Sequence, residues 1–295
     1  MQRLVPVLAV LVALVFFATP IVLHFGQKAH NEVEVDWVTA VPDGSLPGVA
    51  FATGAAAVME NELEGTTGWR PNDIILWGPT LMADNNASRQ MGILQALRET
   101  VRVFKDHLTK ISSDEFDKNL IQADNLLRND PEKWAFPSAE DRYGKAVEHL
   151  QAYVEGLQTD PPTSRQINAR NVELMRLIQV WGDLLGSSHA DLLRDEVPWF
   201  QVDDVFYHTT GNCQVMATMI PAIKIEYARE LEARPVLGTL FDEAHTPLVR
   251  CAHMKPLVVF NGGDTSFLAN QRRNLDAYVT EARQKFYSIR EELDK

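Results

Sequence analysis

The stretch LQALRETVRVFKDHLTKI, residues 94–111, decides the fold class of this chain. Its large apolar residues recur at alternating spacings of three and four, at Leu94, Leu97, Val101, Phe104, Leu108 and Ile111. This period places them on one face of an α-helix over about five turns. The sequence therefore predicts a long amphipathic helix that buries this face against other elements.

Helical patterns continue towards the C-terminus. The same spacing relates three further sets of apolar residues: Val147, Leu150, Val154 and Leu157; Leu174, Ile178, Trp181 and Leu185; and Leu275, Val279, Ala282, Phe286 and Ile289. Ser138-Ala-Glu-Asp141 resembles a capping box at a helix start. We expect one long helix over Asp203–Arg234, kinked at Pro221.

Few other elements are indicated. Pro256–Phe260 is a short β-prone run, and one isolated strand makes no sheet. Gly65–Ala83 is rich in Gly, Pro and Trp, which predicts a structured loop held against the body by its apolar residues. The prediction is an all-α fold, in which an N-terminal transmembrane helix precedes a bundle of seven or eight helices.

The transmembrane helix is predicted from the apolar run Leu4–Leu23, which contains no charged residue. A helix of this length spans about 30 Å, the thickness of a bilayer's hydrocarbon core. A cleaved signal peptide is the alternative, but the run exceeds the usual apolar region of roughly 7–15 residues, and no A-x-A-like site follows it. We therefore expect a retained anchor.

Charges beside the run predict its orientation. Arg3 and the terminal amine precede it, whereas Lys28 follows it and is itself followed by Glu32, Glu34 and Asp36. Positive charge is retained on the cytoplasmic side, so we expect a bacterial inner-membrane protein with a cytoplasmic N-terminus and a periplasmic body. The expected divisions are residues 1–28 as the anchor, 29–46 as a juxtamembrane linker and 47–295 as a helical domain.

The composition favours some classes of partner over others. Apolar residues make up 45% of the chain and charged residues 23%, which is typical of a globular protein. The net charge of −12 disfavours nucleic acid as a partner. The chain has no G-x-S-x-G, S-x-x-K, H-E-x-x-H or P-loop motif, so the interpretation leans away from an enzyme, and no cofactor is predicted.

The chain contains two cysteines, Cys213 and Cys251. In an oxidising periplasm they could form a disulfide, which by closing a long loop would stabilise the fold by ~3–4 kcal/mol. Two buried thiols are an alternative. A zinc site with His208 and His253 is another, but the spacing matches no familiar zinc module, and no metal is predicted.

Several motifs together resemble a known family. Asp84-Asn85 followed by Gln90-x-Gly92, the stretch from Trp134 through Pro137-Ser138 to Tyr143, and Asp203-Asp204-Val205-Phe206-Tyr207 carry much of the match. Further matching segments are Ala169-Arg170, Leu185-Gly186-Ser187, Pro198-Trp199, Asn261-Gly262 and Leu268-Ala269-Asn270. The chain departs from the pattern at Ala87, Arg89 and Val172-Glu173.

These motifs resemble a bacterial, mainly proteobacterial, family of single-anchor inner-membrane proteins catalogued as a domain of unknown function. The resemblance implies one N-terminal anchor and supplies no activity.

Polar and aromatic residues of these motifs form a candidate pocket: Asp84, Asn85, Trp134, Glu140, Arg170, Asp203 and Asp204. The alternative is that they cap helices and hold loops, since most lie at predicted helix starts. A shared small pocket requires Asp84, Arg170 and Asp203 within about 15 Å of one another.

The leading functional hypothesis is a non-catalytic envelope scaffold that binds partner proteins. Its expected partners are the bilayer, through Leu4–Leu23, envelope proteins and a second copy of the chain. The alternative is an envelope enzyme or ligand-binding protein that uses the candidate pocket.

Overall fold

The computed structural model describes residues 4–30, 35–65, 68–73, 84–109, 116–194, 197–198, 201–256, 258–260, 262 and 269–295. Within α1 the side chains described are those of residues 5–19 and Val22. These parts of the chain are helical and contain no β-strand, which confirms the all-α prediction. The α-helices are α1 (Leu4–His30), α2 (Val49–Glu64), α3 (Asn85–Val103), α4 (Lys118–Leu127), α5 (Ala139–Gln158), α6 (Asn171–Leu193), α7 (Val202–Glu226), α8 (Ala228–Ala233), α9 (Pro235–Ala252) and α10 (Gln271–Leu293).

The body contains more helices than the seven or eight expected, because the predicted helix over Asp203–Arg234 is divided. In the structure α7 ends at Glu226, and the short α8 begins at Ala228. The Glu226 carboxylate accepts hydrogen bonds from the backbone N–H groups of Gly48 (2.7 Å) and Phe51 (3.0 Å) at the start of α2. The last residue of α7 thus satisfies donors that α2 would otherwise leave unpaired.

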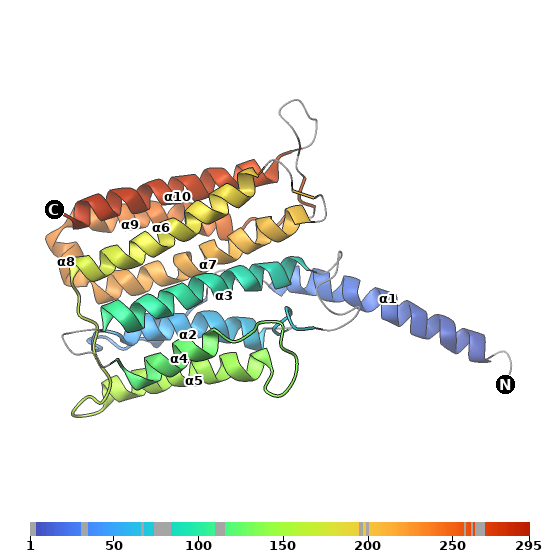
Figure 1. Ribbon diagram of the computed structural model, residues 1–295, viewed down its shortest axis with the longest axis horizontal. Helices are drawn as coiled ribbons and strands as arrows, with labels where there is room; N and C mark the ends of the chain where they lie inside the picture. Colours follow the sequence, from blue (N-terminus) through green and yellow to red (C-terminus); the bar gives the residue numbers. More distant parts are fainter. Residues whose placement is uncertain are drawn as a thin grey trace.

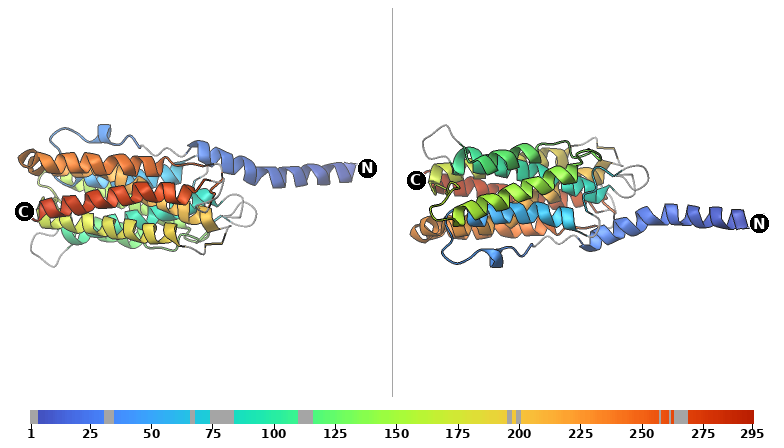
Figure 2. Two further views of the ribbon diagram at one scale, coloured as in Figure 1. Left: turned by 90° about the horizontal axis from the view of Figure 1, so that it is seen from above. Right: turned by 90° about the horizontal axis from the view of Figure 1, so that it is seen from below.

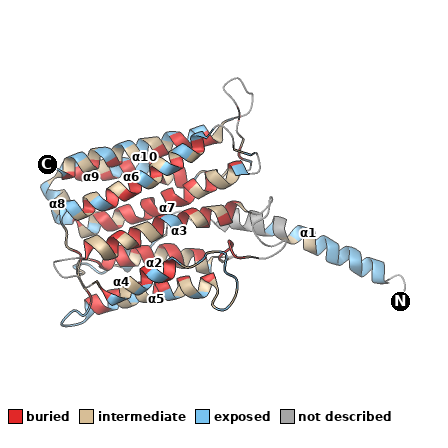
Figure 3. Ribbon diagram, in the orientation of Figure 1, coloured by how far each residue is buried: buried red, intermediate tan, exposed pale blue. Residues whose placement is uncertain are grey.

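Two helices, α3 and α7, form the centre of the bundle (Figure 1). Helices α6, α9 and α10 pack on one side of this pair, and α2, α4 and α5 pack on the other. All residues of 209–220 in α7 are buried, so this helix is enclosed on every side over three turns (Figure 3).

The predicted apolar stripes face this core. A five-residue π-helix, η3 (Phe104–Leu108), continues α3, and the stripe from Leu94 to Leu108 is fully buried. The stripes of α6 and α10 are also buried. Ile111, the last residue of the first stripe, lies outside the described residues.

The central pair makes contact through two glycines. A methyl group on Gly92 of α3 would overlap the carbonyl group of His208 on α7. In return, a methyl group on Gly211 of α7 would overlap the carbonyl group of Arg89 on α3. The two contacts are therefore reciprocal: each helix places one backbone carbonyl against the glycine of the other helix. Only a residue without a side chain permits this approach of the two backbones.

The termini of the helices define two ends of the body. Helix α1 leaves from the end where α3, α5, α7 and α10 begin, which we call the α1 end (Figures 1 and 2). The opposite, far end holds the start of α2 and the end of α10. In the described part of the chain, no helix meets the length and hydropathy needed to cross a membrane.

The linker after α1 runs back along the bundle as a strap, formed by residues 35–48 (Figure 2). Its Trp37 is buried, and the indole ring lies against Gly54 of α2. The strap ends at Gly48, beside Glu226 at the far end. It therefore follows α2 along most of that helix's length.

We predict that Gly92→Ala destabilises the fold by about 1–3 kcal/mol, because the added methyl group must push apart two backbones. Chemical denaturation of the purified full chain in detergent measures this free energy of unfolding. Gly144→Ala in α5 is the control, since a methyl group there meets no atom within 4 Å. In that variant the alanine should leave stability unchanged or raise it by up to about 1 kcal/mol. Equal stability of the two variants would contradict the tight crossing.

Candidate functional site

Most of the candidate pocket residues lie at the α1 end. Asp84 and Asn85 lie at the start of α3, and Asp203 and Asp204 lie in the first turn of α7. Glu140 is the second residue of α5, in its first turn. The structure therefore brings together several residues that are far apart in the sequence.

Arg170 lies elsewhere. It precedes α6 at the far end, where the neighbouring Asn168 donates a backbone hydrogen bond to the carbonyl of Leu108 at the end of η3 (2.7 Å). Asp84 precedes the other end of the same α3–η3 rod, which at ~1.5 Å per residue is more than 30 Å away. One small pocket therefore cannot contain Arg170 together with Asp84 and Asp203.

Glu140 and Trp134 have separate surroundings. The Glu140 carboxylate accepts a hydrogen bond from the Asn72 side chain (2.6 Å), which also donates to the Lys133 carbonyl (3.1 Å). Glu140 thus helps to fix a loop, the role that the capping alternative gives it. The Trp134 side chain is exposed and lines neither of the two cavities described below.

A cavity of about 290 Å³ lies between α3, α6 and α7, and we call it the polar pocket. Its polar lining includes Ser88, Gln95, Ser188, Asp191, Asp204 and His208. Ser88 donates a hydrogen bond to the Asp204 carboxylate (2.7 Å), which joins α3 to α7 at the mouth. Of the sequence candidates, only Asp204 lines this pocket directly.

Burial shifts the pKa of His208, which lines this pocket, and of Asp84, which lies outside the lining but close enough to feel the charge of Asp204. Desolvation, aided by the negative charges of Asp203 and Asp204, raises the pKa of the Asp84 carboxyl to about 7. Burial lowers the pKa of the His208 imidazole, although Asp191 acts in the opposite direction. A carboxyl that titrates near neutrality can exchange protons in this region, and the polar lining of the pocket can bind a small polar molecule.

Asn212 is hydrogen-bonded to two of the residues that line the pocket. It is 1% exposed, and its amide donates hydrogen bonds to Ser188 (3.2 Å) and Gln95 (3.4 Å). Its carbonyl oxygen has no hydrogen-bond partner among the described residues.

No group of three or more His, Cys, Asp or Glu residues is arranged for a metal ion in the part of the chain that the structure describes.

A buried ion pair that the sequence analysis missed lies beside the central crossing. The Arg89 guanidinium binds the Glu62 carboxylate through two hydrogen bonds, of 2.9 and 2.5 Å, and both residues are at least 95% buried. Arg89 also donates to Gln214 (2.7 Å), and Gln90 donates to Glu62 (3.1 Å). The network ties α2, α3 and α7 together, and removal of either charge would leave the other uncompensated.

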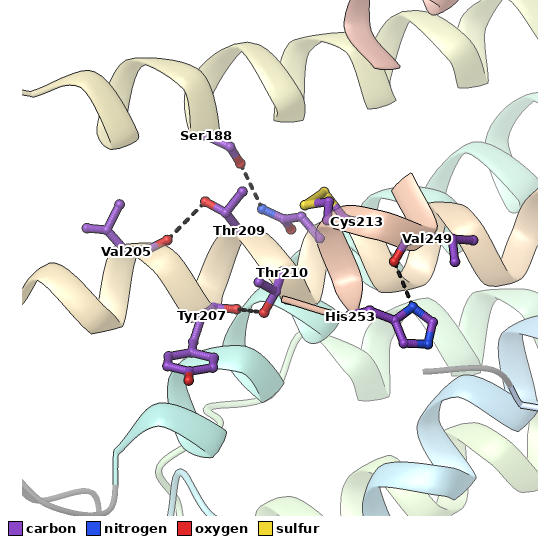
Figure 4. Close-up of a disulfide and its surroundings, with 10 residues drawn as sticks. Ser188, Val205, Tyr207, Thr209, Thr210, Cys213, Val249 and His253 are labelled. Atoms are coloured by element: carbon purple, nitrogen blue, oxygen red, sulfur yellow. Dashed lines mark hydrogen bonds between the residues drawn. A yellow bond between two sulfur atoms is a disulfide. The ribbon is translucent and has the colours of Figure 1, made fainter. Parts of the chain in front are cut away.

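The two cysteines form a disulfide between α7 and α9 (Figure 4). The Cα atoms of Cys213 and Cys251 are 6.1 Å apart, and the bond closes a separation of 38 residues. Both sulfur atoms are therefore bonded to each other rather than to a metal. The His253 ring forms a hydrogen bond with the carbonyl of Val249 on its own helix (2.8 Å).

A second cavity, of about 610 Å³, lies on the opposite side of the bundle from α10, between α2, α5 and the strap. We call this cavity the strap groove. Its floor is apolar and consists mostly of small side chains. Its lining includes Ala52, Ala56 and Leu150, with Trp37 of the strap. Four acids, Asp36, Glu60, Glu64 and Glu155, line it as well, and no lysine or arginine does.

The comparisons place the chain in a family. A family model described as an uncharacterized protein conserved in bacteria (DUF2333) matches residues 2–194 and 187–295. These matches cover nearly the whole chain, so the chain belongs to this family, and the predicted membership of a bacterial family of unknown function is confirmed. No curated protein and no solved structure matches the chain.

We predict that Asp84 makes stability depend on pH. The folded protein binds the Asp84 proton more tightly than the unfolded chain does, because the folded-state pKa is about 7. The contribution of Asp84 to the free energy of unfolding therefore falls as pH rises from about 4 to about 7, and stays low above that.

Asp84→Asn removes this contribution. Relative to wild type, the variant should gain about 1–2 kcal/mol on going from pH 4 to pH 8, a figure reduced for the partial solvent exposure of the carboxyl. Denaturation at a series of pH values measures the gain. With Asp84 present, Asp203→Asn should shift the fall in stability to lower pH, because the Asp203 charge raises the Asp84 pKa. If the difference in free energy of unfolding between Asp84→Asn and the wild type were the same at all pH values, the raised pKa would not belong to Asp84.

Proposed function

We propose that this DUF2333 family member is a single-pass inner-membrane protein, anchored by Leu4–Leu23, whose periplasmic helical body binds partner proteins. The observation that carries the proposal is the surface of α1. Its large apolar side chains are exposed on all sides, with Val5, Leu8, Leu11, Leu14 and Phe17 each 53–69% exposed. An apolar surface of this extent is stable in lipid and costly in water.

The length of the anchor is supported by the sequence. The described side chains of α1 stop before the apolar run does, and the uncharged run continues through Leu23. The helix itself extends to His30. A span over Leu4–Leu23 would therefore leave the last turns of α1 outside the hydrocarbon core, next to the body.

The disulfide supports a periplasmic body. Disulfides persist in oxidising compartments and are rare in the bacterial cytosol. The Cys213–Cys251 bond joins two core helices, so it is part of the folded body rather than an exposed redox pair. This agrees with the charge bias around the anchor, with Arg3 before it and three acids after it.

The strap groove supports the binding of a protein partner. Glu60, Glu64 and Glu155 make no side-chain hydrogen bond or ion pair within the described residues. The α2 residues that line the groove run from Ala52 to Glu64, about 18 Å along the helix axis. An elongated apolar floor with acidic walls suits an amphipathic helix that has an apolar ridge flanked by lysine and arginine.

We predict that the full chain stays in the membrane fraction after alkaline carbonate extraction. Leu11→Arg with Leu14→Arg should release or mislocalise it, because each arginine costs about 2.5–3.5 kcal/mol at the centre of a membrane helix. The matched control is Val172→Arg with Val236→Arg, two exposed apolar residues of the body. Protease added to spheroplasts should digest the body of the wild type. Carbonate release of the wild type would contradict the anchor.

We further predict that the groove selects basic helical peptides. A displayed library of peptides with apolar residues at i, i+3, i+4 and i+7, and random flanking positions, is panned on the full chain in nanodiscs. The enriched peptides should carry lysine or arginine at the flanks. Glu60→Lys, Glu64→Lys and Glu155→Lys together should weaken their binding about tenfold or more, since three pairs of about 0.2–1 kcal/mol are reversed.

The control has the same net charge, with Glu232→Lys, Glu281→Lys and Glu291→Lys on exposed positions away from the groove. It should bind as the wild type does. Peptides without basic flanks, or equal losses in both triple variants, would contradict the groove as the binding site.

A further inference from the structure

Two aromatic side chains project from the loop that joins α4 to α5, residues 128–138. Trp134 is 63% exposed and Phe136 is 97% exposed, whereas Trp37, Trp69 and Trp181 are buried. Aromatic side chains of this size bury large apolar areas in most folded proteins, so two exposed neighbours indicate a surface that another phase or molecule covers.

The loop is held firmly by the body. Trp69 donates a hydrogen bond from its indole to the Pro131 carbonyl (2.9 Å), and Asn72 donates to the Lys133 carbonyl (3.1 Å). The backbone N–H of Ala139 donates to the same Lys133 carbonyl (2.8 Å). Both sides of the loop are therefore fixed, and the exposure of the two aromatics is a property of the fold.

The position of the loop points to the membrane surface. It connects the end of α4 to the start of α5 at the α1 end of the bundle, the end from which the anchor helix leaves (Figure 1). If α1 crosses the bilayer, this end of the body faces the membrane surface. Trp at a membrane surface lies at the headgroup level, with its ring in apolar surroundings and its N–H in a polar one.

We propose that Trp134 and Phe136 insert into the interface of the bilayer that holds α1, and give the body a second attachment to the membrane. This inference rests on the proposed function, since it requires α1 to be a membrane span. The contact is apolar and interfacial rather than electrostatic, because the body is acidic and anionic headgroups repel it. One anchor leaves the body able to tilt, and a second contact fixes one orientation of the bundle.

The test uses the full chain with a spin label at residue 135, between the two aromatics, in nanodiscs of phosphatidylethanolamine and phosphatidylglycerol. The native cysteines are bonded to each other, so Ala135→Cys supplies a reactive thiol. Gln158→Cys, on the last residue of α5 at the far end, is the matched control. The measured quantity is the accessibility of the label to oxygen, which concentrates in lipid, relative to a water-soluble nickel complex.

We expect the ratio at residue 135 to exceed that at residue 158 several-fold. Trp134→Ser with Phe136→Ser should abolish the difference, and thermal unfolding should show that this variant is folded. Equal ratios at the two labelled sites, with Trp134 and Phe136 in place, would overturn the proposal. This is also the result expected if the two aromatics bind a protein rather than the bilayer. Failure of the anchor itself is distinguished, because the wild type would then be absent from the nanodisc fraction.

Discussion

The structure depends on the contact between the backbones of α3 and α7. At this crossing Gly92 receives the His208 carbonyl, and Gly211 receives the Arg89 carbonyl. The side chains of Arg89 and His208, the residues that supply these two carbonyls, reach two different sites. Arg89 reaches the Glu62 carboxylate on α2, whereas the His208 ring lines the polar pocket beside α6. One close approach therefore sets the position of the buried ion pair and of the pocket together.

The distribution of chemistry along the bundle is uneven. The polar pocket, the carboxyl of Asp84 and the exposed aromatics all lie at the α1 end, whereas the far end is fixed by backbone bonds and by Glu226. Asp203 and Asp204 lie in the first turn of α7, where the positive end of the helix dipole offsets part of their charge. In the proposed membrane protein, the polar pocket and Asp84 would therefore lie at the end of the body nearest the bilayer surface.

Local patterns in the sequence predicted the helices, because a buried stripe must repeat with the helical period. The stripe of α10, from Leu275 to Ile289, and the capping box at Ser138 are confirmed residue by residue. Such patterns could not predict contacts between residues that are far apart in the sequence. The Glu226 carboxylate binds backbone groups that lie 178 and 175 residues away, and the partner of Arg89 is 27 residues away. The expectation for Arg170 failed for the same reason: a helix start is visible in sequence, but the end of the bundle at which it lies is not.

The strap has a mechanical consequence. A load on the anchor enters the body through residues 35–48, which run back along α2 to Gly48 at the far end. A pull directed towards the membrane would therefore act along the length of the strap, on the contact of Trp37 with Gly54 and on the bond between Gly48 and Glu226. Because the strap also forms one wall of the groove, tension along the chain would open that groove and alter its fit to an occupant.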